Sequence, residues 1–213
     1  MMQSLTLYTH PMSRGRTARW MLEEIGEPYE SVVFADFGGG MKSADYLAVN
    51  PMGKVPALQH GDTVITECAA ICTYLADAFP QKGLAPALND PQRGVYYRWL
   101  FFVAGPLEAA MMEVALQLKP QESDRTALGY GSLPLCLTAL EQTLSQHDFL
   151  CGNRFSAADL YLSELLDFGI NAVTVIEAKP VFTDYIARQQ ARAAYARASA
   201  IDDALLAEQK IES

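Results

Sequence analysis

The stretch NPMGKVPALQHGDTVITECAAICTYL, residues 50–75, decides the fold. Two short runs of strand-forming residues, 55–60 and 63–65, flank the turn Gly61-Asp62, which predicts an antiparallel hairpin. After the hairpin the apolar residues recur with the spacing of one helical face: Cys68, Ile71, Cys72 and Leu75. We therefore expect a hairpin followed directly by a helix, in the order ββα.

The residues before this stretch alternate between strand and helix patterns. Residues 5–8 favour a strand, and residues 29–34 favour a second one. Between them the apolar positions follow one helical face that ends at a glycine: Ala18, Met21, Leu22, Ile25 and Gly26. Three adjacent glycines within 36–40 indicate a loop. Residues 1–79 are thus expected to form one α/β domain with the order βαβ, loop, ββα.

Prolines and a glycine interrupt the pattern in residues 80–89, which we expect to be a linker. Beyond it helix signals recur and no convincing strand remains. A first helix is expected to start at Asp90-Pro91, bend at Gly105-Pro106 and run to about Leu118. Leucines at helical spacing predict another over 133–144, with an interruption at Pro134. Later signals are a capping box at Ser156 and Asp159, a helix start at Lys179-Pro180 and an alanine-rich helical tail over 186–207. Residues 90–213 are expected to form an all-helical domain.

The composition restricts the class of function. A chain of 213 residues that is 50% apolar can bury a core without disulfide bonds. Its net charge of −9 argues against nucleic acid and anionic membranes as partners. Four cysteines without a C-x-x-C pair and only three histidines predict free thiols and no metal site. No signal peptide or membrane span is evident, so we expect a soluble, cytoplasmic protein.

The proline at position 56 is the first feature that points to binding. Proline cannot donate a hydrogen bond in a central sheet ladder, so Pro56 indicates either an edge strand or a cis bond in a tight turn. A cis bond would leave the N–H and C=O of Val55 free to pair with an extended peptide. The alternative is an ordinary edge-strand proline without a role in binding.

The helix start at Thr66-Glu67-Cys68 is the second feature. Free N–H groups at a helix N-terminus attract a carboxylate, and the Glu67 side chain can pair with an amine. A ligand with both groups on one carbon would satisfy this pair. The alternative is that Thr66 only caps the helix and that Glu67 only suits the helix dipole.

The third feature is the connection between the first strand and the first helix, residues 8–16. A Ser13 hydroxyl near the helix N-terminus can donate to a thiolate, and Arg14 or Arg16 adds positive potential that lowers a bound thiol's pKa. The alternative is that Ser13 is only the N-cap of the helix. A set of aromatic residues can line an apolar pocket or belong to the core: Tyr96, Tyr97, Trp99, Phe101 and Phe102.

These segments occur in the order and spacing of the cytosolic glutathione transferases, and the whole chain resembles that superfamily, with a bacterial, serine-type active site favoured. The resemblance rests on RTARWMLEE at 16–24, NPMGKVPAL at 50–58, TECAAICTYL at 66–75 and FSAADL at 155–160. It implies a thioredoxin-like N-terminal domain that binds glutathione, an all-helical domain that supplies most of the electrophile pocket, and a homodimer. Glutathione is implied as co-substrate, with no other cofactor.

The resemblance also implies the glutathione contacts, which would come from Lys42, Lys54, Val55, Pro56, Glu67 and Cys68. In the family the cis proline, here Pro56, exposes the residue before it to the cysteinyl backbone of glutathione. An acidic residue and a serine hold the γ-glutamyl end, and basic residues meet the glycine carboxylate. In this sequence the corresponding two residues are Glu67 and Cys68, so a cysteine stands in place of the serine. Because a thiol is a poorer hydrogen-bond partner than a hydroxyl, we expect weakened binding at this position.

Three residues are candidates for activating the glutathione thiol. Ser13 corresponds to the serine-type classes and Tyr8 to the tyrosine-type classes, while His10 lies between them. We favour Ser13, because the loop HPMS at 10–13 is longer than a tyrosine-type site needs. The expected reaction is conjugation of glutathione to a small apolar electrophile, a detoxification. The alternatives are glutathione-dependent reduction of peroxides or disulfides, and a transferase-like protein that binds ligands without turnover.

Overall fold

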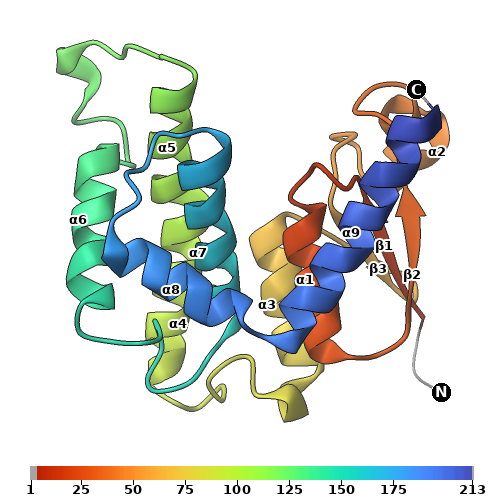
Figure 1. The fold of residues 1–213 in the computed structure, drawn as a ribbon, viewed down its shortest axis with the longest axis horizontal. Coiled ribbons are helices and arrows are strands. Elements are labelled where there is room, and N and C mark those ends of the chain that lie inside the picture. The colour runs from red at the N-terminus through yellow and green to blue at the C-terminus, as the bar shows by residue number, and fades with distance from the viewer. Residues whose placement is uncertain (1–3, 213) are drawn as a thin grey trace. The chain divides into compact units, whose positions relative to one another are not determined.

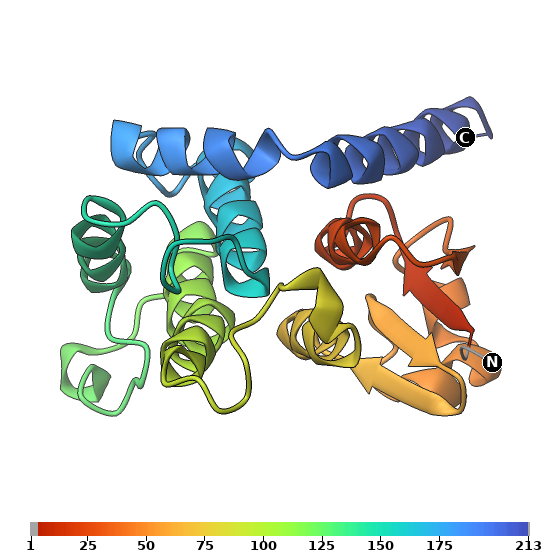
Figure 2. The same cartoon turned by 90° about the horizontal axis from the view of Figure 1, so that it is seen from below.

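The computed structural model describes residues 4–212 and divides into two compact units (Figures 1 and 2). The first unit contains the residues up to Lys82 together with those from Arg192 onward, and the second contains Gly83–Ala191. The boundary at Lys82 lies within the stretch expected to be a linker. The C-terminal segment joins the first unit, so the expectation that all of residues 90–213 form one helical domain is corrected at this point.

The first unit is built on a four-stranded sheet with the strand order β2-β1-β3-β4. β1 (Leu5–Thr9) runs parallel to β2 (Tyr29–Val33) and antiparallel to β3 (Ala57–His60). β3 then pairs with β4 (Thr63–Thr66) in an antiparallel hairpin. The turn uses Gly61 at a φ of 59°, a conformation that favours glycine. The predicted hairpin and the two upstream strands are therefore confirmed.

Helices α1 (Gly15–Ile25) and α3 (Cys68–Ala78) pack against each other in this unit. The apolar stripes predicted for them are buried in both helices. α1 ends at Gly26, whose φ of 66° forms a left-handed cap, as expected. The βαβ and ββα pieces thus give the thioredoxin-like arrangement that the sequence predicts.

A further helix, α2 (Ala44–Val49), follows a short 3-10 turn at Gly40–Lys42. Ser43 caps α2, because its hydroxyl accepts the N–H of Tyr46. The Tyr46 ring lies 5.5 Å from the ring of Tyr8, centroid to centroid. Tyr8 alternates along β1 with buried neighbours, so α2 contacts the sheet from the side opposite to their side chains.

The C-terminal helix α9 (Ala193–Glu212) lies along α1 (Figure 1). Among the described residues, three ion pairs join the two helices: Arg16–Asp203, Arg19–Asp202 and Glu23–Arg197. A fourth joins Glu24 of α1 to Arg192, the residue directly before α9. Because they link the start of α1 to the later part of α9, the helices run antiparallel. The ring of Trp20 also meets that of Tyr195 at 4.8 Å. This contact explains why the C-terminal segment belongs to the first unit.

The second unit contains only helices and turns among its described residues. Its α-helices are α4 (Gln92–Phe102), α5 (Glu108–Ala115), α6 (Leu133–Leu144), α7 (Ala157–Asp167) and α8 (Pro180–Gln190). The helix expected up to about Leu118 is divided by a π-helical turn at Val103–Leu107 that contains Pro106, which cannot donate a backbone hydrogen bond. The interruption expected at Pro134 is wrong, because this proline lies in the first turn of α6, where a missing N–H does no harm.

Helix α7 forms the centre of this unit, since it packs against both α4 and α8. The predicted capping box at its start is present: the Asp159 carboxylate accepts the backbone N–H of Ser156 at 2.9 Å. The same carboxylate also accepts the N–H of Leu150 and the hydroxyl of Tyr185, at 2.8 and 2.9 Å. One buried side chain therefore ties α7 to α8 and to the loop before it.

None of the helices in the described part of the chain combines the length and the apolar character that crossing a membrane requires.

Candidate functional site

The sheet register brings the three predicted features to one edge. Tyr8 near the end of β1 pairs with Ala57 at the start of β3, and Ala57 in turn pairs with Thr66 at the end of β4. Since both pairs of strands are antiparallel, these three strand ends meet. The connections that leave or enter them carry Ser13, the Val55-Pro56 bond and Glu67.

The bond between Val55 and Pro56 is cis. The N–H and C=O of Val55 make no hydrogen bond with any other described residue. The carbonyl of the preceding Lys54 is held by the Tyr46 hydroxyl at 2.6 Å and by the Asn50 amide at 2.7 Å. The backbone at Val55 therefore offers one free donor and one free acceptor at a well-anchored position, as the cis alternative predicted.

The two lysines of the predicted site have different environments. Lys54 is exposed. The Lys42 ammonium donates to the carbonyls of Met52 and Gly53, at 3.0 and 2.9 Å. An ammonium has three donors, so Lys42 braces the loop before Val55 and keeps one N–H for a ligand.

Helix α3 starts at Cys68, with Glu67 as its N-cap residue. Within the described chain no side chain caps this helix, so the reading in which Thr66 caps it is wrong; Thr66 is the last residue of β4. Glu67 has a φ of 66° and a ψ of 119°, which is strained for a residue with a Cβ. The first N–H groups of α3 and an exposed carboxylate are thus presented together.

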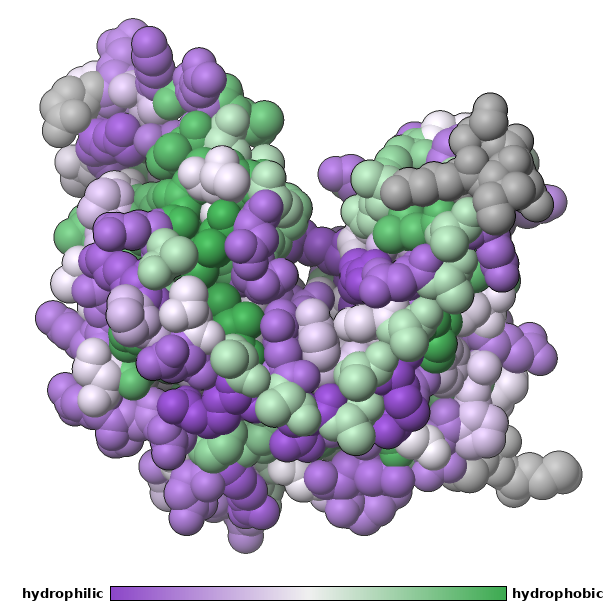
Figure 3. Space-filling view, in the orientation of Figure 1, coloured by the Kyte–Doolittle hydropathy of each residue, from purple (hydrophilic) through white to green (hydrophobic). Residues whose placement is uncertain are grey.

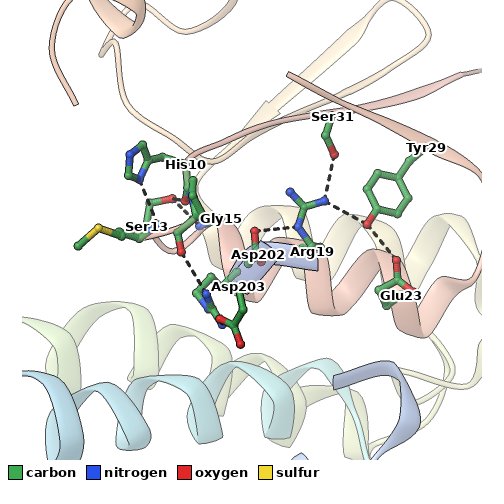
Figure 4. A network of polar contacts seen from close by, with 12 residues as sticks. His10, Ser13, Gly15, Arg19, Glu23, Tyr29, Ser31, Asp202 and Asp203 are labelled. Atoms are coloured by element: carbon green, nitrogen blue, oxygen red, sulfur yellow. Dashed lines mark hydrogen bonds and ion pairs between the residues drawn. The ribbon is translucent and has the colours of Figure 1, made fainter. Parts of the chain in front are cut away.

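Ser13 closes the turn at the start of α1 (Figure 4). Its hydroxyl donates to the carbonyl of His10 at 2.7 Å and accepts the N–H of Gly15 at 2.9 Å. The hydroxyl therefore does support the helix start, but the N-cap residue of α1 is Arg14, so the alternative in which Ser13 is the N-cap is wrong. The Ser13 side chain is only half-buried, however, so rotation about the C–O bond would redirect its proton to a ligand while the oxygen keeps the bond from Gly15.

The other two candidate activating residues are engaged elsewhere. The Tyr8 hydroxyl donates to the side chain of Gln59 at 3.0 Å. His10 is buried, and its Nδ1 accepts the N–H of Met12 at 3.1 Å. Of the three candidates, Ser13 has the side chain that lies at a helix N-terminus, where the dipole favours a negative charge.

Cys68 connects the starts of the two helices. Its buried thiol donates to the carbonyl of Arg14 at 3.6 Å, one residue after Ser13. The thiol therefore uses its proton inside the protein, whereas the resemblance places it at the γ-glutamyl end of the ligand. The helix N–H groups of α3 are the remaining donors at that position.

The other cysteines are unsuited to nucleophilic chemistry. All four are free and buried, as predicted. Burial raises the pKa of the Cys136 thiol, and burial together with the Asp159 charge raises the pKa of Cys151 to about 12. Both thiols stay protonated at neutral pH. Within residues 4–212, no cluster of three or more His, Cys, Asp or Glu side chains could hold a metal ion.

Gly15 is a residue of the site that the sequence reasoning missed. A Cβ placed on Gly15 would lie 1.9 Å from Oγ1 of Thr9 and 2.9 Å from Oγ of Ser13. Only glycine allows the start of α1 to approach the end of β1 so closely. A glycine in the first turn of a helix, against helix propensity, is the signal that could have revealed it.

Two family models match this chain. The model described as "Glutathione S-transferase, N-terminal domain" matches residues 3–77, and "Glutathione S-transferase, C-terminal domain" matches residues 131–192. The first match contains the whole edge described above.

Individual relatives agree with these models. Glutathione S-transferase GST-4.5 of Xanthomonas campestris is 31% identical over 168 residues, which cover 74% of this chain and 79% of the relative. Glutathione S-transferase GstA of Escherichia coli O157:H7 is 36% identical over 123 residues, 57% of this chain and 60% of GstA, so the chain spans less than two thirds of that relative.

Solved structures extend the likeness to almost the whole chain. A glutathione transferase from Methylococcus capsulatus has a TM-score of 0.78 and 31% identity, and the match covers 93% of this chain and 98% of that one. A sphingomonad glutathione S-transferase complexed with glutathione has a TM-score of 0.73 and 30% identity, with the same coverage. The chain belongs to the glutathione S-transferase family.

Proposed function

We propose that this protein binds glutathione at the edge formed by Ser13, Val55 and Glu67, stabilises its thiolate with the Ser13 hydroxyl, and conjugates it to a small apolar electrophile. The observation that carries the proposal is the set of unpaired backbone groups at this edge: those of Val55 and those at the start of α3. A homodimeric, cytoplasmic enzyme of detoxification is part of the same proposal.

Each part of glutathione finds a complementary group in this arrangement. The γ-glutamyl carboxylate fits the N–H groups of α3, and its amine pairs with Glu67. The cysteinyl backbone pairs with Val55 as a short added strand. The glycine carboxylate meets Lys54, with the third N–H of Lys42 as a further donor. Binding is expected to be weaker than it would be with serine at position 68, because the Cys68 thiol donates to a carbonyl of the protein.

The chemistry requires a thiolate at neutral pH. A free thiol with a pKa near 8.5 is mostly protonated at pH 7, and each unit of pKa depression corresponds to about 1.4 kcal/mol. The hydroxyl of Ser13 would turn from the His10 carbonyl to the sulfur and keep the bond from Gly15. One such hydrogen bond and the dipole of α1 supply roughly one to two units. The thiol proton leaves to solvent, and the sulfur lone pair forms the bond to the electrophilic carbon. On an aryl chloride the carbon–chlorine bond then breaks, and chloride leaves to solvent with that electron pair.

The apolar nature of the electrophile is supported by the helical unit. Large apolar side chains stay exposed around the end of α5, namely Val114, Leu116 and Leu118 at 46%, 61% and 57%. Figure 3 shows hydrophobic side chains gathered over α5. In contrast, Tyr96 and Trp99 of the aromatic set are core residues. Exposed apolar groups of this kind are typical of surfaces that receive apolar ligands.

Ser13→Ala is expected to lower kcat by roughly 10- to 100-fold while the Kd for glutathione changes less than about twofold. Loss of the hydroxyl removes one hydrogen bond to the thiolate and so raises the thiol pKa by about one unit or more. Calorimetric titration gives the Kd, thiolate absorbance from pH 5 to 9 gives the pKa, and turnover with an activated aryl chloride gives kcat.

Tyr8→Phe is the matched control and should keep kcat within about twofold, because its hydroxyl donates to Gln59. If Tyr8→Phe loses turnover and Ser13→Ala does not, Tyr8 is the activating residue. Glutathione binding without a thiolate at any pH below 9 in the wild-type protein would favour the non-catalytic alternative. Turnover of peroxides or mixed disulfides in place of aryl chlorides would favour the reductase.

Glu67→Gly is expected to raise the free energy of unfolding by about 1 kcal/mol and at the same time to weaken glutathione binding at least tenfold. Glycine relieves the positive φ, but it removes the carboxylate that pairs with the ligand amine. Glu67→Ala keeps the strain and loses the carboxylate, so it should weaken binding without the gain in stability. Urea unfolding and calorimetry measure the two quantities. Equal stability of the glycine and alanine variants would show that the strain is absent in solution.

A further inference from the structure

The loop that carries Ser13 is held from the far end of the chain. Asp203 on α9 accepts a hydrogen bond from Nη2 of Arg16 at 2.7 Å, and Nη1 of the same guanidinium donates to the carbonyl of Pro11 at 3.3 Å (Figure 4). Pro11 lies in the loop between β1 and α1, two residues before Ser13. A chain of polar contacts therefore runs from the C-terminal helix to the activating loop.

The guanidinium suits this role because it is planar and rigid. Its position is set by α1 at one end and by Asp203 at the other, so its second nitrogen can hold a carbonyl in a defined place. The loop itself is closed by the bond from the Ser13 N–H to the His10 carbonyl at 2.9 Å. Since the Ser13 hydroxyl uses the same carbonyl, the direction of that hydroxyl depends on where the loop lies.

The contact with Asp203 is not what attaches α9 to α1. The side chains of Arg16 and Asp203 are 30% and 65% exposed, and a surface ion pair of this kind contributes little to stability. The adjacent pair is buried, with Arg19 and Asp202 at 2% and 0%, and it anchors the helix. Asp203 can therefore be replaced without detaching α9.

We propose that Asp203 is a positioning residue for the proposed thiol activation: through Arg16 and the Pro11 carbonyl it holds the loop in the place where the Ser13 hydroxyl reaches the glutathione sulfur. The proposal rests on the function proposed above. It assigns α9 a part in catalysis although no residue of this helix needs to touch the ligand.

The sign of the effect separates positioning from charge. If Asp203 holds the loop, its loss leaves the hydroxyl less often in place, and the pKa of the bound thiol rises. If Asp203 acted as a negative charge near the thiolate, its loss would leave the positive charge of Arg16 uncompensated, and the same pKa would fall. Glutathione affinity should change little in the first case, because the main binding groups lie at Val55 and at the start of α3.

The experiment uses the full chain with Asp203→Ala, Asp203→Asn and, as the matched control, Arg197→Gln. The control removes an ion pair between the same two helices, Arg197–Glu23, near the other end of α1. Thiolate absorbance of the glutathione complex across pH 5 to 9, the Kd from calorimetry, and kcat and KM for an aryl chloride at pH 6.5 are measured for each.

We expect Asp203→Ala to raise the thiol pKa by about half a unit to one unit and to lower kcat at pH 6.5 by roughly three- to tenfold, with Kd within twofold. Asp203→Asn retains an acceptor for Arg16 and should lie near the wild type, as should Arg197→Gln. An unchanged thiol pKa in Asp203→Ala overturns the proposal. A fall of the thiol pKa in both Asp203 variants also overturns it. A wild-type complex without a thiolate overturns the proposed function itself, which distinguishes the two failures.

Discussion

Asp159→Ala is expected to lower the free energy of unfolding of the helical unit by about 4 kcal/mol. The carboxylate is fully buried and accepts hydrogen bonds from the N–H groups of Leu150 and Ser156 and from the hydroxyls of Ser156 and Tyr185. Burial raises the pKa of the Tyr185 hydroxyl well above its ordinary value, so it remains a donor. Alanine removes the acceptor of four buried donor groups, and each donor left without a partner costs about 1–3 kcal/mol.

The two tryptophans allow each unit to be followed separately. Trp20 lies on α1 in the first unit and Trp99 on α4 in the second, and both are buried. Urea unfolding of a Trp20→Phe background, monitored by Trp99 fluorescence, therefore reports on the unit that contains Asp159. If the alanine variant does not fold, Asp159→Asn keeps one acceptor oxygen and should show an intermediate loss.

Asp148→Ala is the matched control within the same unit. Asp148 forms a surface ion pair with Arg188, and the two side chains are 73% and 41% exposed. Its removal should change the unfolding free energy by less than about 1 kcal/mol. Equal losses in the Asp148 and Asp159 variants would contradict the view that buried hydrogen bonding at the start of α7 holds this unit together.

Local patterns were sufficient for the elements themselves. The stripe at Ala18, Met21, Leu22 and Ile25 and the turn at Gly61 are decided by neighbours within a few residues, and both are confirmed. The capping box at Ser156 and Asp159 is likewise a local signal. The further hydrogen bond that Asp159 accepts from the Tyr185 hydroxyl is not a local signal, because Tyr185 lies 26 positions further along the chain.

The attachment of α9 could not be predicted in this way. The four ion pairs join residues 168 to 187 positions apart, and each charge alone looks like one on a solvated helix face. From the sequence alone the whole C-terminal tail is therefore expected to belong to the helical domain. Only the structure shows that basic and acidic blocks on α1 and α9 match in antiparallel order.

The candidate site was predictable to the level of residue type, and its hydrogen bonding was not. Proline at 56 and an acidic residue before a helix at 67 are visible in the sequence as departures from ordinary strand and helix patterns. That the thiol of Cys68 donates to Arg14, and that Lys42 braces the loop at Met52, depends on side-chain directions that no spacing rule contains.

Gly15→Ala is the change expected to affect turnover most after removal of Ser13 itself. The new Cβ would overlap with Oγ1 of Thr9 at 1.9 Å, and Thr9 is fully buried, so the start of α1 has to move away from the sheet. We expect a loss of about 2–3 kcal/mol in unfolding free energy, as for overpacking in a core. The same Cβ lies 2.9 Å from Oγ of Ser13 and displaces the hydroxyl, so kcat should fall at least tenfold.

Adding Thr9→Ala to this variant separates the two effects. The shorter side chain removes the 1.9 Å overlap and leaves a contact of 3.0 Å with the Cβ of residue 9, so most of the stability should return. The contact with Ser13 is unchanged, and kcat should stay low. Urea unfolding followed by Trp20 in a Trp99→Phe background and turnover at pH 6.5 measure both quantities. If turnover recovers together with stability, the fold of α1 limits the reaction and the direction of the Ser13 hydroxyl does not. If kcat stays low in a stable double variant, catalysis depends on that hydroxyl.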